Sequence, residues 1–422
     1  MKRLLHVILF AVLVGAFIWL APRPELVTAV AADARPHVHS PATRAVDPVN
    51  VPAALTELAR EHEVLLVYFV PADREPMAGQ PERMRVAARF AADFLRADLA
   101  DKRLETEGLD FVFDGDRPRV ELVRGRRPAE WYHGEEARAE VHGHVTNEGD
   151  ALLWSVYHEV ARALGPASRR IYVIFSDTHA AGEPCFRSHG NVARGVQLSR
   201  DSGALVVSAW IAGEGWCAPD AYEQLSLFDD RTLVEGCLRP DGTRPRLPVF
   251  ELVEEAFGSL THELGHALGL LHDFRTPAED LMARGTRGFR PGYRGRSAAP
   301  PRVWISPQNA LFLRRSPYLF DDVDLADTAE PTLEGRLGEA RAGSQEVPLE
   351  LVATDDGELA ALVFYSPRHD TILAGFEAHG ARMEVRRSIP HPTLEPGALE
   401  VVAFAVDRGG NRAAILMRGD VR

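Results

Sequence analysis

The stretch HELGHALGLLHD, His262–Asp273, has the spacing HExxHxxGxxH, which predicts a metal-binding helix at the centre of the fold. His262 and His266 are four residues apart, so on a helix they project from one face and can bind one metal ion through neutral imidazoles. Glu263 lies beside them. Its carboxylate is the group that could accept a proton from a metal-activated water, as a general base does.

The second half of the stretch predicts a third ligand. Gly269 has no Cβ to oppose a left-handed conformation, so the chain can leave the helix there and return His272 toward the metal. Three protein ligands leave a fourth position for water, which is typical of a catalytic zinc site. With 16 His and 34 Gly among 422 residues, chance assembly of the five fixed positions has a probability on the order of 10⁻⁴. A buried helix that carries histidines by accident is the alternative interpretation.

The residues before the motif predict the helix that carries it. Pro248 stands where a helix start tolerates proline. Apolar residues then recur at helical spacing through the motif. They are Val249, Leu252, Val253, Ala256, Phe257, Leu260, Leu264, Ala267, Leu268 and Leu271.

These residues resemble the metzincin superfamily of zinc metallopeptidases. The resemblance implies one zinc ion with the three histidines of the motif as ligands and its glutamate as catalytic base: His262, His266, His272 and Glu263. It also implies a methionine turn beneath the metal, for which Met282 is the candidate; such a methionine packs under the ligands and does not bind the ion. The implied fold class is α+β, a twisted mixed sheet with an active-site helix.

The net charge and the N-terminal sequence limit which partners the protein can have. The formal net charge of −13 excludes a nucleic-acid binder, which needs a basic surface to neutralise phosphates. Lys2 and Arg3 precede an apolar run, Leu4–Ala21, which is typical of a secretory signal or a signal anchor. The run is near the length that spans a bilayer, so it would tether the chain to a membrane if it is not cleaved. The body of the chain is expected outside the cytoplasm, as a secreted, periplasmic or membrane-anchored protein.

Three cysteines suit export, since one disulfide and one free thiol can form in an oxidising compartment. Cys185 and Cys217 flank the same predicted strand and are the preferred pair, with Cys237 left over.

The chain divides into a signal peptide or anchor (1–35), a tether (36–62), a metzincin-like catalytic domain (63–323), a linker (324–345) and a small β-sandwich (346–422), similar to immunoglobulin-like accessory domains. Predicted helices cover 81–104, 151–165, 249–271 and 306–315. Predicted strands cover 64–71, 111–113, 120–123, 171–175 and 203–211, and in the sandwich 349–354, 359–365, 371–378, 383–387, 401–406 and 412–417.

Some assignments stay open between two interpretations. Gly203–Ile211 is either the edge strand beside the active site, where an extended peptide would pair, or an ordinary interior strand, and the segment before it is predicted as loop. His142 and His144 would share a strand face and could begin a second metal site, although no third ligand is evident. Tyr293, in a basic glycine-rich run, could assist an oxyanion or lie in a solvated loop.

The sequence therefore predicts an exported zinc metalloendopeptidase that hydrolyses peptide bonds in a protein or peptide substrate. Two alternatives remain: a zinc amidase acting on cell-wall peptides or small amides, and a non-catalytic surface binding protein with a retained zinc helix. Cleavage-site preference, latency, oligomeric state and the ligand of the C-terminal domain do not follow from the sequence.

Overall fold

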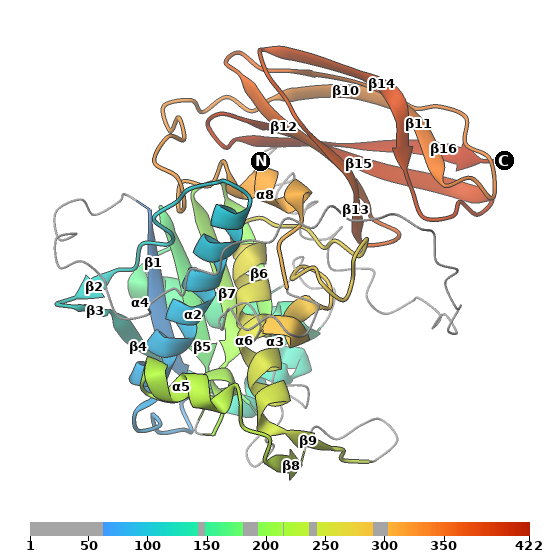
Figure 1. Cartoon of the computed structure of the whole chain (residues 1–422). Coiled ribbons are helices and arrows are strands. Elements are labelled where there is room, and N and C mark those ends of the chain that lie inside the picture. Colours follow the sequence, from blue (N-terminus) through green and yellow to red (C-terminus); the bar gives the residue numbers. More distant parts are fainter. Residues whose placement is uncertain (1–61, 142–147, 180–192, 214, 236–242, 290–302) are drawn as a thin grey trace.

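The computed structural model describes residues 62–141, 148–179, 193–213, 215–235, 243–289 and 303–422, which form an α+β protein. Residues 62–323, the N-terminal unit, fold around a twisted mixed sheet. Residues 332–421 form two further sheets, the sandwich (Figure 1). The predicted fold class is thus confirmed.

The N-terminal unit contains both strands and helices. In chain order they are β1 (Glu63–Val70), α2 (Gln80–Asp101), β2 (Phe113–Asp114), β3 (Arg117–Pro118), β4 (Val120–Arg124), η1 (Ala129–His133), α3 (Glu135–Glu140), α4 (Glu148–Leu164), β5 (Arg170–Ser176), β6 (Arg194–Ser199), β7 (Ser202–Ser208), η2 (Ala209–Ala212), α5 (Ala221–Leu227), β8 (Leu233–Glu235), β9 (Arg246–Pro248), α6 (Val249–Ala267), η3 (Gly285–Gly288) and α8 (Pro307–Leu313).

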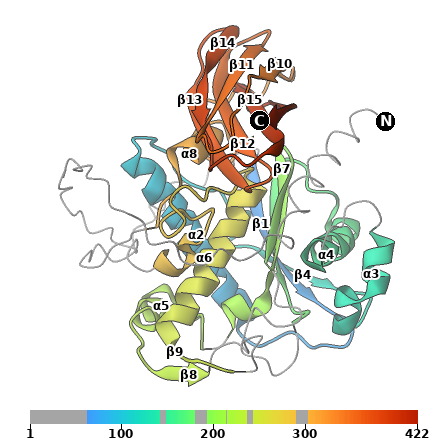
Figure 2. The same ribbon diagram turned by 90° about the vertical axis from the view of Figure 1, so that its right-hand side faces the viewer.

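The central sheet has the order β4-β1-β5-β7-β6, in which only β6 runs antiparallel to its neighbour. Helices α2 and α6 cover one face, and α3 and α4 lie on the other (Figure 2). Side chains along β1 alternate between these layers: Leu66 and Tyr68 pack toward α2 and α6, whereas Val67 and Phe69 pack toward α4. Both faces are buried, and this explains why β1 reads as a continuous apolar run.

The strand order decides between the two interpretations of 203–211 and corrects the predicted loop before it. Strand β7, the core of the predicted 203–211 strand, pairs with β5 on one side and β6 on the other, so it lies inside the sheet. The edge strand on the α6 side of β7 is β6, in the segment predicted as loop; β4 forms the opposite edge of the sheet. The residues of β6 are half-buried, mixed in polarity and interrupted by Gly195, so they carry a weak strand signal.

The sandwich is built from β10 (Thr332–Leu337), β11 (Glu346–Thr354), β12 (Leu359–Ser366), β13 (Thr371–Glu377), β14 (Arg382–Pro390), β15 (Gly397–Asp407) and β16 (Arg412–Val421). All pairings are antiparallel, with sheet orders β10-β11-β14 and β13-β12-β15-β16. Side chains from both sheets share one apolar core. Strand β10 falls within the segment that was predicted as linker.

The sandwich and the N-terminal unit share an apolar interface. On β12, Leu362 and Phe364 point into the sandwich, while Val363 and Tyr365 belong to the large core that also includes α2 and α6. Helix α8 lies between the two parts (Figures 1 and 2). Its N-cap is Ser306, whose hydroxyl accepts a hydrogen bond from the Asn309 backbone N–H, as predicted for the Ser-Pro start of this helix.

The predicted disulfide is contradicted, and several other predicted residues lie outside the described ranges. Cys217 carries a buried free thiol, which contradicts its predicted pairing with Cys185. Cys185, Cys237, His142, His144 and Tyr293 lie outside the described residues, as does the N-terminal apolar run. Among the described residues, no helix is both long and apolar enough to span a bilayer.

Candidate metal centre

Helix α6 places the first two histidines, and its end places the third. The helix ends at Ala267 and is capped by Leu268. The next residue, Gly269, adopts φ 87°. Its N–H donates to the His266 carbonyl (2.9 Å), and the Leu270 N–H donates to the Gly265 carbonyl (2.9 Å). This pair of bonds is a Schellman motif, in which a left-handed residue, here the predicted glycine, closes the helix.

The segment after the turn is held by a buried amide. Asn309 of α8 accepts a hydrogen bond from the Leu271 N–H (3.0 Å) through Oδ1 and donates to the Leu271 carbonyl (2.8 Å) through Nδ2. Asn309 is fully buried. This two-way contact fixes the backbone that leads into His272.

The three histidines bring their Nε2 atoms together. His266 Nε2 lies 3.1 Å from His262 Nε2 and 3.1 Å from His272 Nε2. Nitrogen ligands about 2.1 Å from a tetrahedral ion lie about 3.4 Å from one another, so this spacing is close to that of a filled zinc shell. The predicted ligand triad is therefore a cluster that could hold a metal.

Each imidazole is also oriented by an acceptor on its other nitrogen. The Nδ1 atom of His262 lies 2.7 Å from the Leu281 carbonyl oxygen, and that of His266 lies 3.0 Å from the Leu270 carbonyl oxygen. The Nδ1 atom of His272 lies 2.7 Å from Asp370 Oδ2. Because carbonyls and carboxylates only accept, Nδ1 carries the proton in each ring, and three Nε2 lone pairs converge.

The surroundings of His262 and His266 keep these two rings neutral. Burial, and then the neighbouring His272, lower the pKa of His262 to about 3. Burial and the two other rings also hold the pKa of His266 well below its usual range. A neutral imidazole is the form that binds a metal, so these surroundings fit a metal centre.

Glu263 lies in the same buried environment. Burial raises the pKa of its carboxyl, while the Arg194 guanidinium, His272 and a hydrogen bond from the Gly195 backbone N–H lower it. Strand β6 passes very close at this point: a Cβ built on Gly195 would lie 1.9 Å from the Glu263 carbonyl oxygen. The edge strand of the sheet is thus packed directly on the catalytic candidate.

Met282, the candidate for the methionine turn, packs against helix α6 between the first two histidines. It is fully buried, and its Sδ would lie 2.6 Å from a Cβ built on Gly265, on the helix turn between the first two ligands. The Met282 N–H donates to Asp280 Oδ1 (2.8 Å), and its carbonyl accepts from the Asp273 N–H (3.2 Å). Burial, and then the nearby Asp273 carboxylate, raise the pKa of Asp280 to about 7.

Sequence reasoning missed the contribution of the sandwich. Asp370 contacts His272 from 98 positions further along the chain. From β16, an Arg412 guanidinium N–H donates to the Gly269 carbonyl (2.8 Å) and to Gln197 Oε1 (2.9 Å), supporting the helix end. Neither residue belongs to a local motif, so no pattern in the sequence could have pointed to it.

The fold and the cluster together define an α+β protein with a three-histidine candidate metal centre at the end of a buried helix. No protein-family model matches the sequence, and no curated protein matches it. Among solved structures, the fold is similar to OgpA from Akkermansia muciniphila. The catalytically inactive form of OgpA, in complex with an O-glycopeptide (glycodrosocin) substrate, has a TM-score of 0.56 and 14% identity; the match covers 88% of this chain and 98% of OgpA. A wild-type OgpA structure has a TM-score of 0.54 and 13% identity, with the same coverage. At these identities the likeness concerns the fold.

Proposed function

We propose that this protein is an exported zinc-dependent metalloendopeptidase. The observation that carries the proposal is the convergence of three Nε2 atoms, each from a ring whose Nδ1 is held by an acceptor, with Glu263 next in sequence to the first ligand. Export is part of the proposal because Leu4–Ala21 has the composition of a signal or anchor.

The residues present fit a zinc ion. His262, His266 and His272 would hold it through Nε2, which leaves a position for water. What zinc supplies when bound is Lewis acidity, which polarises a carbonyl group and lowers the pKa of water to about 7. Glu263 would take the proton of the attacking water and pass it to the leaving amine. Burial and the raised pKa of its carboxyl suit a group that must both accept and release a proton.

Strand β6 offers a place for an extended substrate. Within the described residues no strand pairs with the outer edge of β6. A peptide that added to this edge would lie beside Gly195, and therefore beside Glu263, by main-chain hydrogen bonding of the kind seen in strand addition. A sheet edge without a pairing strand among the described residues supports extended peptides as substrates rather than small amides.

The test combines metal content with hydrolysis. Purified full-length protein should bind about one zinc per chain and cleave a denatured-protein mixture. Glu263→Gln should keep the zinc and lose about 100- to 10,000-fold in rate, because the proton acceptor is gone. Glu251→Gln, in the exposed first turn of the same helix, is the matched control and should behave as wild type.

The substrate panel should also contain O-glycosylated peptides and small amides, since the structure of inactive OgpA holds an O-glycopeptide. Cleavage of small amides alone would favour the amidase. Zinc binding without hydrolysis of any substrate in the panel would favour the non-catalytic binding protein. Absence of zinc binding would refute the metal centre.

A further inference from the structure

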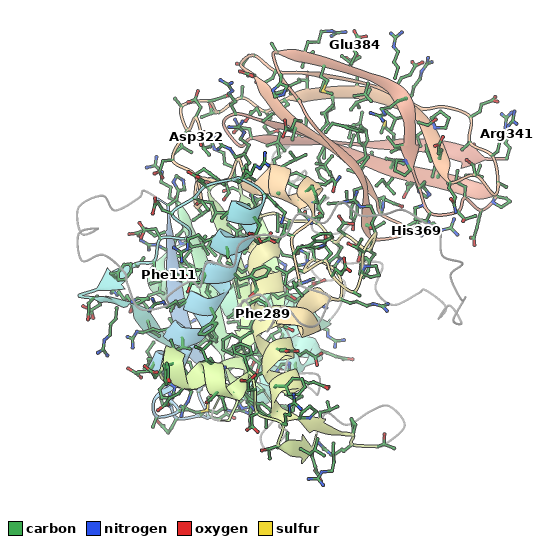
Figure 3. All side chains as sticks on the ribbon, viewed as in Figure 1. Phe111, Phe289, Asp322, Arg341, His369 and Glu384 are labelled. Atoms are coloured by element: carbon green, nitrogen blue, oxygen red, sulfur yellow. The ribbon has the colours of Figure 1, made fainter. Side chains whose placement is uncertain are left out.

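We propose that the C-terminal sandwich is an integral part of the metal centre, with Asp370 as the positioning residue for His272; this rests on the proposed metal centre. Asp370 lies on the turn between β12 and β13, at the end of the sandwich that faces the N-terminal unit. Figure 3 shows the neighbouring His369 at that end.

The contact has the geometry of a carboxylate–histidine pair. Asp370 Oδ2 accepts from His272 Nδ1 at 2.7 Å, and the two side chains are 20% and 14% exposed. This is a length typical of a charge-assisted hydrogen bond. The carboxylate keeps the proton on Nδ1 and turns Nε2 toward the other two rings.

His272 depends on this contact more than its two partners do on theirs. His262 and His266 are built on a helix, and their Nδ1 atoms donate to carbonyls close by in the N-terminal unit. His272 lies beyond the end of α6. Its ring is held by a side chain from the sandwich, so its orientation requires the sandwich to be docked.

Residues next to Asp370 also form hydrogen bonds with the segment that carries His272. The Ile372 N–H donates to the His272 carbonyl (3.1 Å), and the Phe274 N–H donates to Thr371 Oγ1 (2.7 Å). Ile372 is fully buried in the core shared by the two parts. Asp370 and the first two residues of β13 therefore hold the segment from His272 to Phe274.

Asp370 is itself held in one orientation. The Tyr365 hydroxyl, at the end of β12, donates to Asp370 Oδ1, which leaves Oδ2 for His272. Asp370 also adopts φ 50°, a left-handed conformation that Asp, Asn and Gly tolerate better than other residues. A pre-positioned acceptor of this kind lowers the ordering required when a metal binds.

The test measures zinc affinity of the full-length protein by competition between zinc sulfate and a chromophoric chelator. Asp370→Gly removes the carboxylate without opposing the positive φ, and should weaken zinc binding about 10- to 100-fold. Asp370→Asn keeps an acceptor oxygen and should lose less. Tyr365→Phe, which frees the carboxylate to rotate, should cause a smaller loss.

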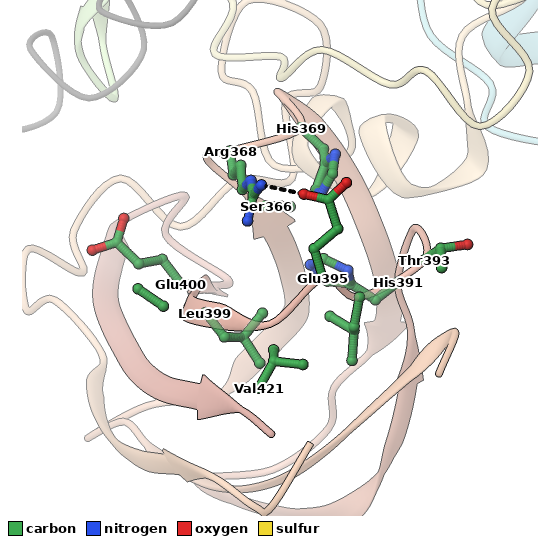
Figure 4. A pocket seen from close by; sticks show the side chains of 11 residues that line it. Ser366, Arg368, His369, His391, Thr393, Glu395, Leu399, Glu400 and Val421 are labelled. Carbon is green, nitrogen blue, oxygen red and sulfur yellow. Dashed lines mark hydrogen bonds and ion pairs between the residues drawn. The ribbon is translucent and has the colours of Figure 1, made fainter. Parts of the chain in front are cut away.

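The matched control is Arg368→Ala in the same turn. Arg368 forms an ion pair with Glu395 (2.6 Å) beside a small pocket of the sandwich (Figure 4). It does not contact His272 within the described hydrogen bonds and ion pairs, so its loss should leave zinc affinity unchanged.

A second readout separates positioning from general stability. Cobalt-substituted protein should show a changed visible absorption spectrum in Asp370→Asn, while the melting temperature of the metal-free protein stays close to that of wild type. If Asp370→Gly and Asp370→Asn both bind zinc within threefold of wild type, this inference is wrong although the metal centre stands. If wild type itself binds no zinc, the proposed function fails with it.

Discussion

Gly195→Ala should damage the candidate site without touching a metal ligand. The new Cβ would lie 1.9 Å from the Glu263 carbonyl oxygen and 2.8 Å from its carbonyl carbon, where ordinary contacts begin at 3.4 Å. Both atoms are backbone in the middle of α6 and cannot rotate away. Strand β6 must therefore move outward by about 1.5 Å to relieve the overlap.

Two energetic terms follow from that displacement. Forcing a methyl group into a packed contact costs about 1–3 kcal/mol. Loss of the Gly195 N–H bond to the Glu263 carboxylate adds about 1.5–3 kcal/mol, as expected for a charged acceptor. We therefore expect the free energy of unfolding to fall by about 2.5–6 kcal/mol. Because an error of about 1 Å in a reacting group can lower rates about 100-fold, hydrolysis should fall by at least that factor.

The assay is urea unfolding of the full-length protein, together with zinc content and peptide hydrolysis. Zinc should stay bound, since all three ligands lie outside β6. Gly134→Ala is the matched control, because a Cβ there meets nothing closer than 3.4 Å at an ordinary φ of −83°; it should change stability by no more than about 1 kcal/mol. If Gly195→Ala unfolds and hydrolyses like the Gly134→Ala control, the close packing of β6 on α6 is refuted.

Three further changes test other parts of the structure. Gly269→Ala should destabilise the protein, because φ is 87° and the new Cβ would lie 2.1 Å from the Arg412 guanidinium; unchanged thermal melting would contradict this helix end. Met282→Ala should cost about 2–5 kcal/mol in urea unfolding, from the cavity left under the ligands, whereas Met282→Leu should cost less than about 1.5 kcal/mol; equal costs would argue against tight packing there. Burial raises the pKa of Asp407 to about 6, above its ordinary 3.8. The Asp407 carboxyl therefore binds its proton more tightly in the folded state than in the unfolded state. The resulting stabilisation of the folded state is fully present below about pH 4 and is lost as the pH rises through about 6. Asp407→Asn should flatten that part of the dependence of unfolding free energy on pH, and an unchanged curve would refute the assignment.

If the three histidines bind a metal as proposed, metal binding and docking of the sandwich are energetically linked. Asp370 and Arg412 both come from the sandwich and contact the segment that carries Gly269 and His272. A metal that holds His272 in place therefore also favours docking of the sandwich, because any ligand that binds the folded arrangement stabilises it. Removal of metal by a chelator is thus expected to loosen the contacts of Asp370.

Local sequence determined the helix, its end and the three clustered histidines. The fourfold spacing of His262 and His266, and the glycine after the last helical turn, act over a few residues, so a pattern in one stretch is enough to predict them. Met282, which packs against Gly265, was a candidate only through the family resemblance.

Tertiary structure alone decided which strand borders the site and what holds His272. Strand β7 is apolar on both faces because it is buried in the sheet interior, whereas β6 is half-exposed and so resembles a loop in sequence. Asp370 reaches His272 across 98 positions, and an aspartate in a turn has many unrelated roles. Contacts between distant segments depend on the packing of whole layers, which a pattern of neighbouring residues does not encode.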